Sequence, residues 1–307
     1  MPTFTRRTPL SGSAETRLTV AVTGASGLVG LSLIPFLTAG GHVARGVGRK
    51  GSELDPSALF GADAVVHLAG AGVADERWTD ARKQVLVDSR VAYTRQLVAA
   101  LSRLERRPKV LVSASALGAD GERGDEVLTE DSAVGGREGA AGFLAGLCAD
   151  WEAAASEATA LGVRVVNLRI GLVQSARGGA LAKLLMPFKA GLGGPIGSGK
   201  QWQSWISLGD LLGAIHHALF TESLSGPVNA VGPAPVTSAE YAKVLGRVLS
   251  RPAFVPVPAF ALRALFGELA DGAILASQRV LPKRLETSGF QFLHADLDAA
   301  LRFTLGR

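Results

Sequence analysis

Short apolar runs alternate with longer segments of helical spacing along most of the chain. Residues 18–23 form a β-branched apolar run that predicts a strand, and a glycine-rich turn follows it. Apolar residues then recur at helical spacing from 28 to 38, and this pattern ends at Gly40 and Gly41. The N-terminal part of the chain therefore predicts a strand, a turn and a helix.

The same alternation continues to residue 169. Strands that alternate with helices are typical of an α/β fold, here a Rossmann-type doubly wound parallel sheet. Further strands are predicted at 42–47, 64–69, 109–113 and 163–169, and helices at 81–104 and 151–161.

A glycine-rich region from 171 to 200 interrupts this rhythm and marks the start of a second lobe. Asp210 is predicted as the N-cap of a helix that ends at Phe220, and residues 226–230 predict one more strand of the first domain. The rest of the chain is mostly helical in pattern. We therefore predict a disordered leader at 1–17, a dinucleotide-binding domain at 18–172 with 209–231, and a smaller, mostly helical C-terminal lobe at 173–208 and 232–307.

The turn "TGASGLVG" carries the clearest chemical signal. Gly24, Gly27 and Gly30 permit a tight turn, a close approach of backbone to a pyrophosphate, and close packing of helix on strand, respectively. Glycine-rich loops also occur without a ligand, but the flanking strands and helix favour dinucleotide binding here. The predicted cofactor contacts are Gly24, Ser26, Gly27, Leu28, Val29 and Gly30, with Leu68, Ala69, Gly70 and Ser113 at the ends of two later strands.

The end of the second strand indicates which dinucleotide binds. An acidic side chain about 20 residues beyond the turn would accept a hydrogen bond from the ribose 2′-hydroxyl of NAD. The chain has "VGRKGSE" there, and Arg49 and Lys50 suit the 2′-phosphate of NADP. Basic residues after a strand are often only solvated, which leaves NAD as the alternative. The connection from Arg49 to residue 64 is too short for an extra strand and helix, which predicts an abbreviated adenine pocket.

Composition limits the class of protein. Of the 307 residues, 47% are hydrophobic and 19% are charged, so we expect a sizeable core. The net charge of +5 comes from scattered basic residues, which argues against nucleic acid as a partner. Cys148 is the only cysteine, so no disulfide and no zinc-type metal site is predicted. No apolar run reaches the ~20 residues of a membrane helix, and we expect a cytoplasmic protein.

Four longer stretches resemble a known family. They are "ERWTDARKQVLVDSR", "FLAGLCADWEAAA", "GGALAKLLMPFKAGLGGPIGSGKQWQSWI" and "PAFALRALFGELADGAILASQRVLPKRL". Together with the turn and "HLAGAG", they are similar to atypical extended short-chain dehydrogenases/reductases, in the sugar-nucleotide epimerase-like branch with a small C-terminal domain of unknown function. The resemblance implies an NADP-binding epimerase fold. It also implies, by analogy with the superfamily, a homodimer formed through helices that flank the sheet.

The usual acid/base pair of this superfamily is missing from the chain. Its members move a proton with a tyrosine whose pKa is lowered by a lysine four residues later. Tyr93 and Tyr241 are the only tyrosines, and each is followed at that spacing by leucine. Where the resemblance aligns the catalytic helix, Phe143 and Leu147 stand near the expected positions.

Ser115 and Asp120 are the remaining catalytic candidates. Ser113 and Ser115 stand at the end of the strand at 109–113, where such enzymes place a serine that binds the substrate oxygen, and Ser115 is the first choice; the alternative is a hydroxyl bonded to local backbone. Relatives often carry a tyrosine pair after this strand, and Ala119 and Asp120 stand there instead. Asp120 would act as a carboxylate base if partly buried, whereas a solvated loop aspartate is the alternative.

Two further clusters are predicted to line a substrate cleft. Arg77 and Trp78 offer a cation and a stacking surface for an anionic or ring-bearing ligand. Lys200, Gln201 and Trp202 form a second set between the lobes. Packing in the core or at an interface explains the tryptophans equally well.

The sequence therefore predicts an oxidoreductase that performs NADP-dependent redox or epimerase-like chemistry on a hydroxyl or carbonyl substrate, with sugar nucleotides as one class. In this hypothesis Ser115 orients the substrate oxygen. The alternative is a non-catalytic NADP(H)-binding regulatory protein in cell-division control, because retained glycines and an absent Tyr/Lys pair suit such a protein.

Overall fold

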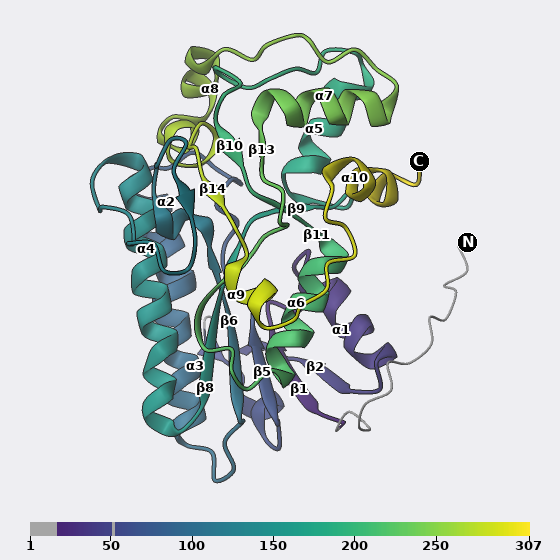
Figure 1. The fold of residues 1–307 in the computed structure, drawn as a ribbon. Coiled ribbons are helices and arrows are strands. Elements are labelled where there is room, and N and C mark those ends of the chain that lie inside the picture. The colour runs from purple at the N-terminus through teal and green to yellow at the C-terminus, as the bar shows by residue number, and fades with distance from the viewer. Residues whose placement is uncertain (1–16, 51–52) are drawn as a thin grey trace.

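A six-stranded parallel sheet forms the centre of the molecule (Figure 1). The computed structural model describes residues 17–50 and 53–307, apart from the side chains of Arg49, Lys50 and Glu53. Nearly all of the predicted leader lies outside the described residues. Every neighbouring pair in the sheet is parallel, which confirms the Rossmann-type doubly wound fold. In spatial order the strands are β12 (Gly226–Ala230), β8 (Arg164–Ile170), β6 (Val110–Ala116), β5 (Ala64–His67), β1 (Thr19–Thr23) and β2 (Val43–Gly46).

The strand order reverses beside β1. The chain passes from β1 to β2 on one side and then returns to β5 on the other side. In open α/β sheets, ligands bind outside the carboxyl ends of the strands at such a switch point. The turn after β1 and the residues after β5 therefore flank the expected binding crevice.

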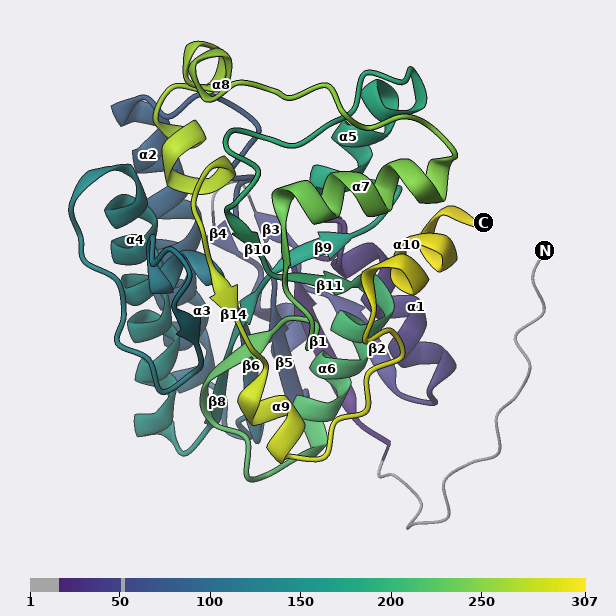
Figure 2. The same ribbon diagram turned by 45° about the horizontal axis from the view of Figure 1, so that its top comes forward.

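Helices cover both faces of the sheet (Figures 1 and 2). Alternate residues of β1 point to opposite faces of the sheet: Val20 and Val22 belong to one buried cluster, and Ala21 belongs to the other. The first cluster includes side chains of α1 (Gly30–Ala39) and α6 (Leu208–Phe220). The second includes side chains of α3 (Tyr93–Ser102) and α4 (Gly139–Ser156).

The segment before α3 is not one regular helix. α2 (Asp80–Val87) is followed by a π-helical turn (Asp88–Ala92), and only then does α3 begin. A π-turn widens the helix by one residue and often occurs at a functional site.

The connection from β2 to β5 is short, as predicted from the sequence. A two-stranded hairpin of β3 (Arg49–Lys50) and β4 (Glu53–Leu54) and a 3₁₀ turn (Pro56–Leu59) lead to β5. Within the described residues, no strand lies beyond β2.

The remaining elements form a mostly helical C-terminal part (Figure 2). It has its own buried cluster around Trp205 and Tyr241. It contacts the loops at the carboxyl ends of the sheet. A side chain on Gly178 would touch Leu28 of the glycine-rich turn, and one on Gly272 would collide with the ring of Trp78. These elements are β9 (Leu172–Gln174), α5 (Gly179–Lys189), β10 (Trp202–Gln203), β11 (Trp205–Ser207), β13 (Val236–Thr237), α7 (Ser238–Leu249), α8 (Ala259–Phe266), a π-turn (Ala270–Ile274), β14 (Arg279–Val280, paired with β7, Val127–Leu128), α9 (Lys283–Thr287) and α10 (Leu297–Leu305).

The start of α6 differs from the sequence prediction. Ser207 is the N-cap, and its hydroxyl accepts a hydrogen bond from the backbone N–H of Asp210. The prediction of Asp210 as the N-cap was wrong by one helical turn, because both residue types cap helices and the sequence does not show which one stands first. In the described part of the chain, no helix is long and apolar enough to cross a membrane.

Candidate functional site

The glycine-rich turn is packed as a dinucleotide site requires. Gly24 has φ +67°, and a Cβ there would lie 2.7 Å from the carbonyl of Leu68. A Cβ on Gly30 would lie 2.3 Å from the carbonyl oxygen of Gly24. A Cβ on Gly27 would come near only that same oxygen, at 3.3 Å. Gly27 and Ser26 are both exposed. Gly24 and Gly30 thus close the turn, while Gly27 leaves it open to a ligand.

The N-terminus of α1 is free to receive an anion. No side chain caps it, and its first turn contains no acidic residue. The partial positive charge of the helix dipole at this end would therefore stabilise a pyrophosphate bound at the turn. The residues present fit a dinucleotide.

A buried histidine holds the residues after β5 against this turn. His67 Nδ1 is 2.7 Å from Thr23 Oγ1, and His67 Nε2 is 2.8 Å from Thr94 Oγ1. Thr23 Oγ1 also accepts hydrogen bonds from the backbone N–H groups of Leu68 and Ala69. This network ties β1, β5 and α3 together at the edge of the crevice.

The other predicted cofactor residues have varied surroundings. The side chains of Arg49 and Lys50 lie outside what the structure describes, so their role stays a prediction. Leu28 and Val29 lie in the turn and are half-buried. Ser113 is fully buried, and its hydroxyl donates to the carbonyl of Ala114.

A buried ionic network lies at the carboxyl ends of β6 and β8. Ser115 Oγ donates to Glu152 Oε1 at 2.6 Å. Arg169 holds the same carboxylate with two hydrogen bonds of 2.8 and 3.0 Å, and its Nη1 reaches Asp120 Oδ1 at 3.4 Å. Ser115 and Arg169 face each other across the β6–β8 pair, and Glu152 comes from α4. The network joins the two predicted catalytic residues through Glu152 and Arg169.

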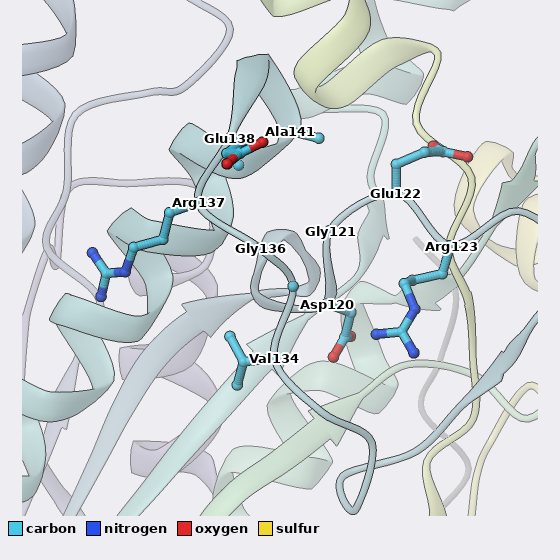
Figure 3. Close-up of a pocket in the computed structure, with 11 residues that line it drawn as sticks. Asp120, Gly121, Glu122, Arg123, Val134, Gly136, Arg137, Glu138 and Ala141 are labelled. Carbon is cyan, nitrogen blue, oxygen red and sulfur yellow. The ribbon is translucent and has the colours of Figure 1, made fainter.

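Asp120 is buried rather than solvated. Its side chain is 0% exposed, and its Oδ2 has no hydrogen-bond partner among the residues that the structure describes. Burial raises the pKa of this carboxyl to about 6, although Arg169 lowers it. Asp120 also lines a pocket of about 380 Å³, with Arg123 and Arg137 on opposite sides (Figure 3). A carboxyl group with a pKa of about 6 thus lies buried in the wall of a space of ligand size.

Helix α4 presents no proton donor of the usual kind to this site. Near the end of β6, a Cβ on Gly118 would lie 3.0 Å from Leu144 and 3.5 Å from Cys148. Phe143 instead packs edge-on against Trp78. Burial raises the pKa of the Cys148 thiol to about 12, so the thiol stays protonated. Leu144 and Cys148 are therefore the α4 side chains that lie against Gly118, just beyond β6.

The two predicted substrate-cleft clusters are largely engaged in packing. Trp78 is buried and donates its indole N–H to the carbonyl of Val73. Trp202 donates to Asp125 and lies under the guanidinium of Arg279. Arg77 lies near Gly267 of the C-terminal part, Gln201 is buried with an unpaired Oε1, and Lys200 is exposed.

Glu152 and Arg169 were not among the residues singled out from the sequence. The signal for Arg169 is a charged residue within the apolar strand "VVNLRIGLV", because a buried cation requires a partner. Glu152 offers no such signal, since an acidic residue on a helix is ordinarily exposed.

The fold and site have clear relatives. Residues 20–231 match the model of the NAD dependent epimerase/dehydratase family. The chain belongs to this family. Residues 257–304 match a domain of unknown function, DUF1731, which covers the end of the chain. The resemblance drawn from the sequence is thereby confirmed.

Members of the family match over nearly the whole chain. Epimerase family protein Mb2239 of Mycobacterium bovis is 42% identical and covers 94% of this chain and 98% of that protein. Human epimerase family protein SDR39U1 is 36% identical and covers 92% and 98%, respectively. The crystal structure of human SDR39U1 (isoform 2) with NADPH superposes with a TM-score of 0.84 at 33% identity, over 94% of this chain and 99% of that one.

Proposed function

We propose that this chain binds NADP(H) in the crevice beside the glycine-rich turn and acts as an oxidoreductase of the extended short-chain dehydrogenase type. Its substrate is a compound with a hydroxyl or carbonyl group, of which sugar nucleotides are one class. The observation that carries the proposal is Asp120, a fully buried carboxyl with one unpartnered oxygen at the pocket near the strand ends.

The shape of the turn and the NADPH bound to the human relative support the choice of cofactor. When bound, the nicotinamide gives or accepts a hydride. Arg49 and Lys50, at the start of the hairpin beside β2, supply the positive charge that suits a 2′-phosphate.

Asp120 takes the role of the missing tyrosine. Because its pKa is about 6, the carboxylate form is available at neutral pH to accept a proton from a substrate hydroxyl. Arg169 contacts only Oδ1, which leaves Oδ2 for this transfer. Ser115 donates its own proton to Glu152, so its oxygen is left to accept a hydrogen bond from the substrate. These residues replace the usual Tyr/Lys pair without a phenol or an ammonium group.

The test combines binding and turnover. Calorimetric titration should show NADPH binding, and Arg49→Glu should weaken NADPH by at least about tenfold while leaving NADH nearly unchanged. A substrate screen that follows the absorbance of NADPH should then find turnover. In Asp120→Asn this turnover should fall by about 10²- to 10⁴-fold with NADPH affinity retained. Failure of both dinucleotides to bind overturns the proposal.

The regulatory alternative has one observation in its favour. Leu144 and Cys148, the α4 side chains that lie against Gly118, offer no proton at neutral pH. Tight NADPH binding with no turnover across a broad screen, and a partner affinity that changes with the dinucleotide, would establish this alternative instead.

A further inference from the structure

A buried arginine lies beneath the residues that follow β5. Arg90 stands in the π-turn between α2 and α3, and it is 8% exposed. Its Nη2 donates to the carbonyl of Ala71 at 2.8 Å, and its Nη1 donates to the carbonyl of Leu86. The guanidinium carbon lies 3.2 Å from the position that a Cβ on Gly70 would take. The π-turn thus places a cation directly under the "HLAGAG" segment.

The charge of Arg90 is not neutralised by the protein. In the part of the chain that the structure describes, no carboxylate lies within ion-pair distance of it. Burial is the main cause that lowers the pKa of its guanidinium, Cys148 acts in the opposite direction, and the nearby cation Arg82 lowers it further. The ring of Trp151, 5.2 Å away, and two carbonyl groups are its main compensation. Leaving a cation buried in this way is costly unless a ligand complements it.

Arg90 lies under the two residues that follow those packed against the glycine-rich turn. Gly24 touches Leu68 and Ala69 at the phosphate end, and the next two residues, Gly70 and Ala71, lie over Arg90. Arg90 also acts electrostatically on Cys148 of α4, which lies at the end of β6. In the proposed binding mode, a dinucleotide that runs from the glycine-rich turn towards the pocket of Asp120 passes the segment above Arg90 with its nicotinamide half.

We propose that Arg90 sets the redox preference of this site, so that the protein holds the reduced dinucleotide more tightly than the oxidised one. This inference rests on the proposed NADP(H) binding. The oxidised nicotinamide ring is positively charged and the reduced ring is neutral, whereas the phosphates are the same in both. A cation without a carboxylate partner beside the ring disfavours only the oxidised form, and in a partly desolvated site this repulsion is weakly screened.

The test is the ratio of dissociation constants for NADP⁺ and NADPH, measured by titration of the full chain at neutral pH. The wild-type protein should bind NADPH at least about tenfold more tightly, which corresponds to about 1.4 kcal/mol. Arg90→Gln and Arg90→Met, the latter keeping an apolar contact with Trp151, should bring the ratio to about threefold or less. Arg90→Lys should retain most of the preference because it retains the charge.

Arg82 provides the matched control. It donates to the carbonyl of Gly72 in the same segment, but Asp75 and Glu76 neutralise its charge. Arg82→Gln should therefore change both affinities alike and leave the ratio intact. Equal binding of NADP⁺ and NADPH by the wild-type protein overturns the inference without any variant, and so does an unchanged ratio in Arg90→Gln or Arg90→Met. Binding of neither form overturns the proposed function itself.

Discussion

The buried site at β6 and β8 holds one guanidinium between two carboxylates. Arg169 pairs fully with Glu152 and only weakly with Asp120, and all three side chains are largely removed from water. If both carboxylates were ionised, the group would carry a net negative charge in a medium that solvates it poorly. The free energy is lowest if Asp120 keeps its proton to a higher pH, and its pKa is accordingly raised to about 6. The raised pKa of Asp120 thus follows first from its burial and then from the opposing charges of Arg169, which lowers it, and Glu152, which raises it.

The raised pKa of Asp120 predicts how the free energy of unfolding depends on pH. Folded Asp120 keeps its proton up to about pH 6, whereas the unfolded carboxyl releases it near its ordinary pKa of 3.8. Between these values the folded state binds more protons, so the free energy of unfolding should fall as pH rises, by about 2 to 3 kcal/mol from this group. Urea unfolding at pH 4, 5, 6 and 7 should show that Asp120→Asn lacks this loss. The exposed Asp80→Asn serves as control, and an equal pH slope in wild type and Asp120→Asn would contradict the assignment.

The sequence led to part of this site and not to the rest. Ser115 and Asp120 stand out because they follow an apolar strand, and strand ends are where α/β proteins bind ligands. Glu152 becomes a neighbour of Ser115 only through the packing of α4 on β6, and Arg169 only through the pairing of β6 with β8. Such contacts between distant residues leave no trace in local spacing.

At the scale of elements, the β1–α1 unit depends on the absence of side chains. Gly30→Ala would place a methyl group 2.3 Å from the carbonyl oxygen of Gly24, so the helix must move away from the turn. We expect the free energy of unfolding, measured by thermal unfolding, to fall by about 1 to 3 kcal/mol. NADPH binding, measured by titration, should also weaken. Gly40→Ala, at the other end of α1 with ordinary contacts, should stay within about 0.5 kcal/mol. Similar effects of the two substitutions would mean that the turn is loosely packed.

Element boundaries were predicted best where a short apolar run is bounded by glycine or polar residues. The run at 64–69 contains β5, and 163–169 overlaps β8 almost entirely. The helix predicted at 81–104 was found as α2, a π-turn and α3. A single π-turn shifts the helical phase by one residue, which hydrophobic periodicity does not resolve. The irregularity missed from the sequence is the one that carries Arg90.

At the scale of the whole molecule, Asp210 fastens the C-terminal segment to the nucleotide-binding sheet. Its buried carboxylate accepts hydrogen bonds from Ser207 and from the backbone N–H groups of Leu293 and His294. Asp210→Ala removes the acceptor of the buried Ser207 hydroxyl and of two part-buried backbone N–H groups, which should cost about 2 to 4 kcal/mol. Hydrogen exchange should quicken through residues 293–305 more than in β1 and β5, because α10 would open locally before the sheet unfolds. Asp296→Ala removes only the exposed N-cap of α10 and should cost about 1 kcal/mol. If exchange instead rose equally in α10 and the sheet, the C-terminal segment and the sheet would unfold as one unit, and Asp210 would support the whole fold rather than a single attachment.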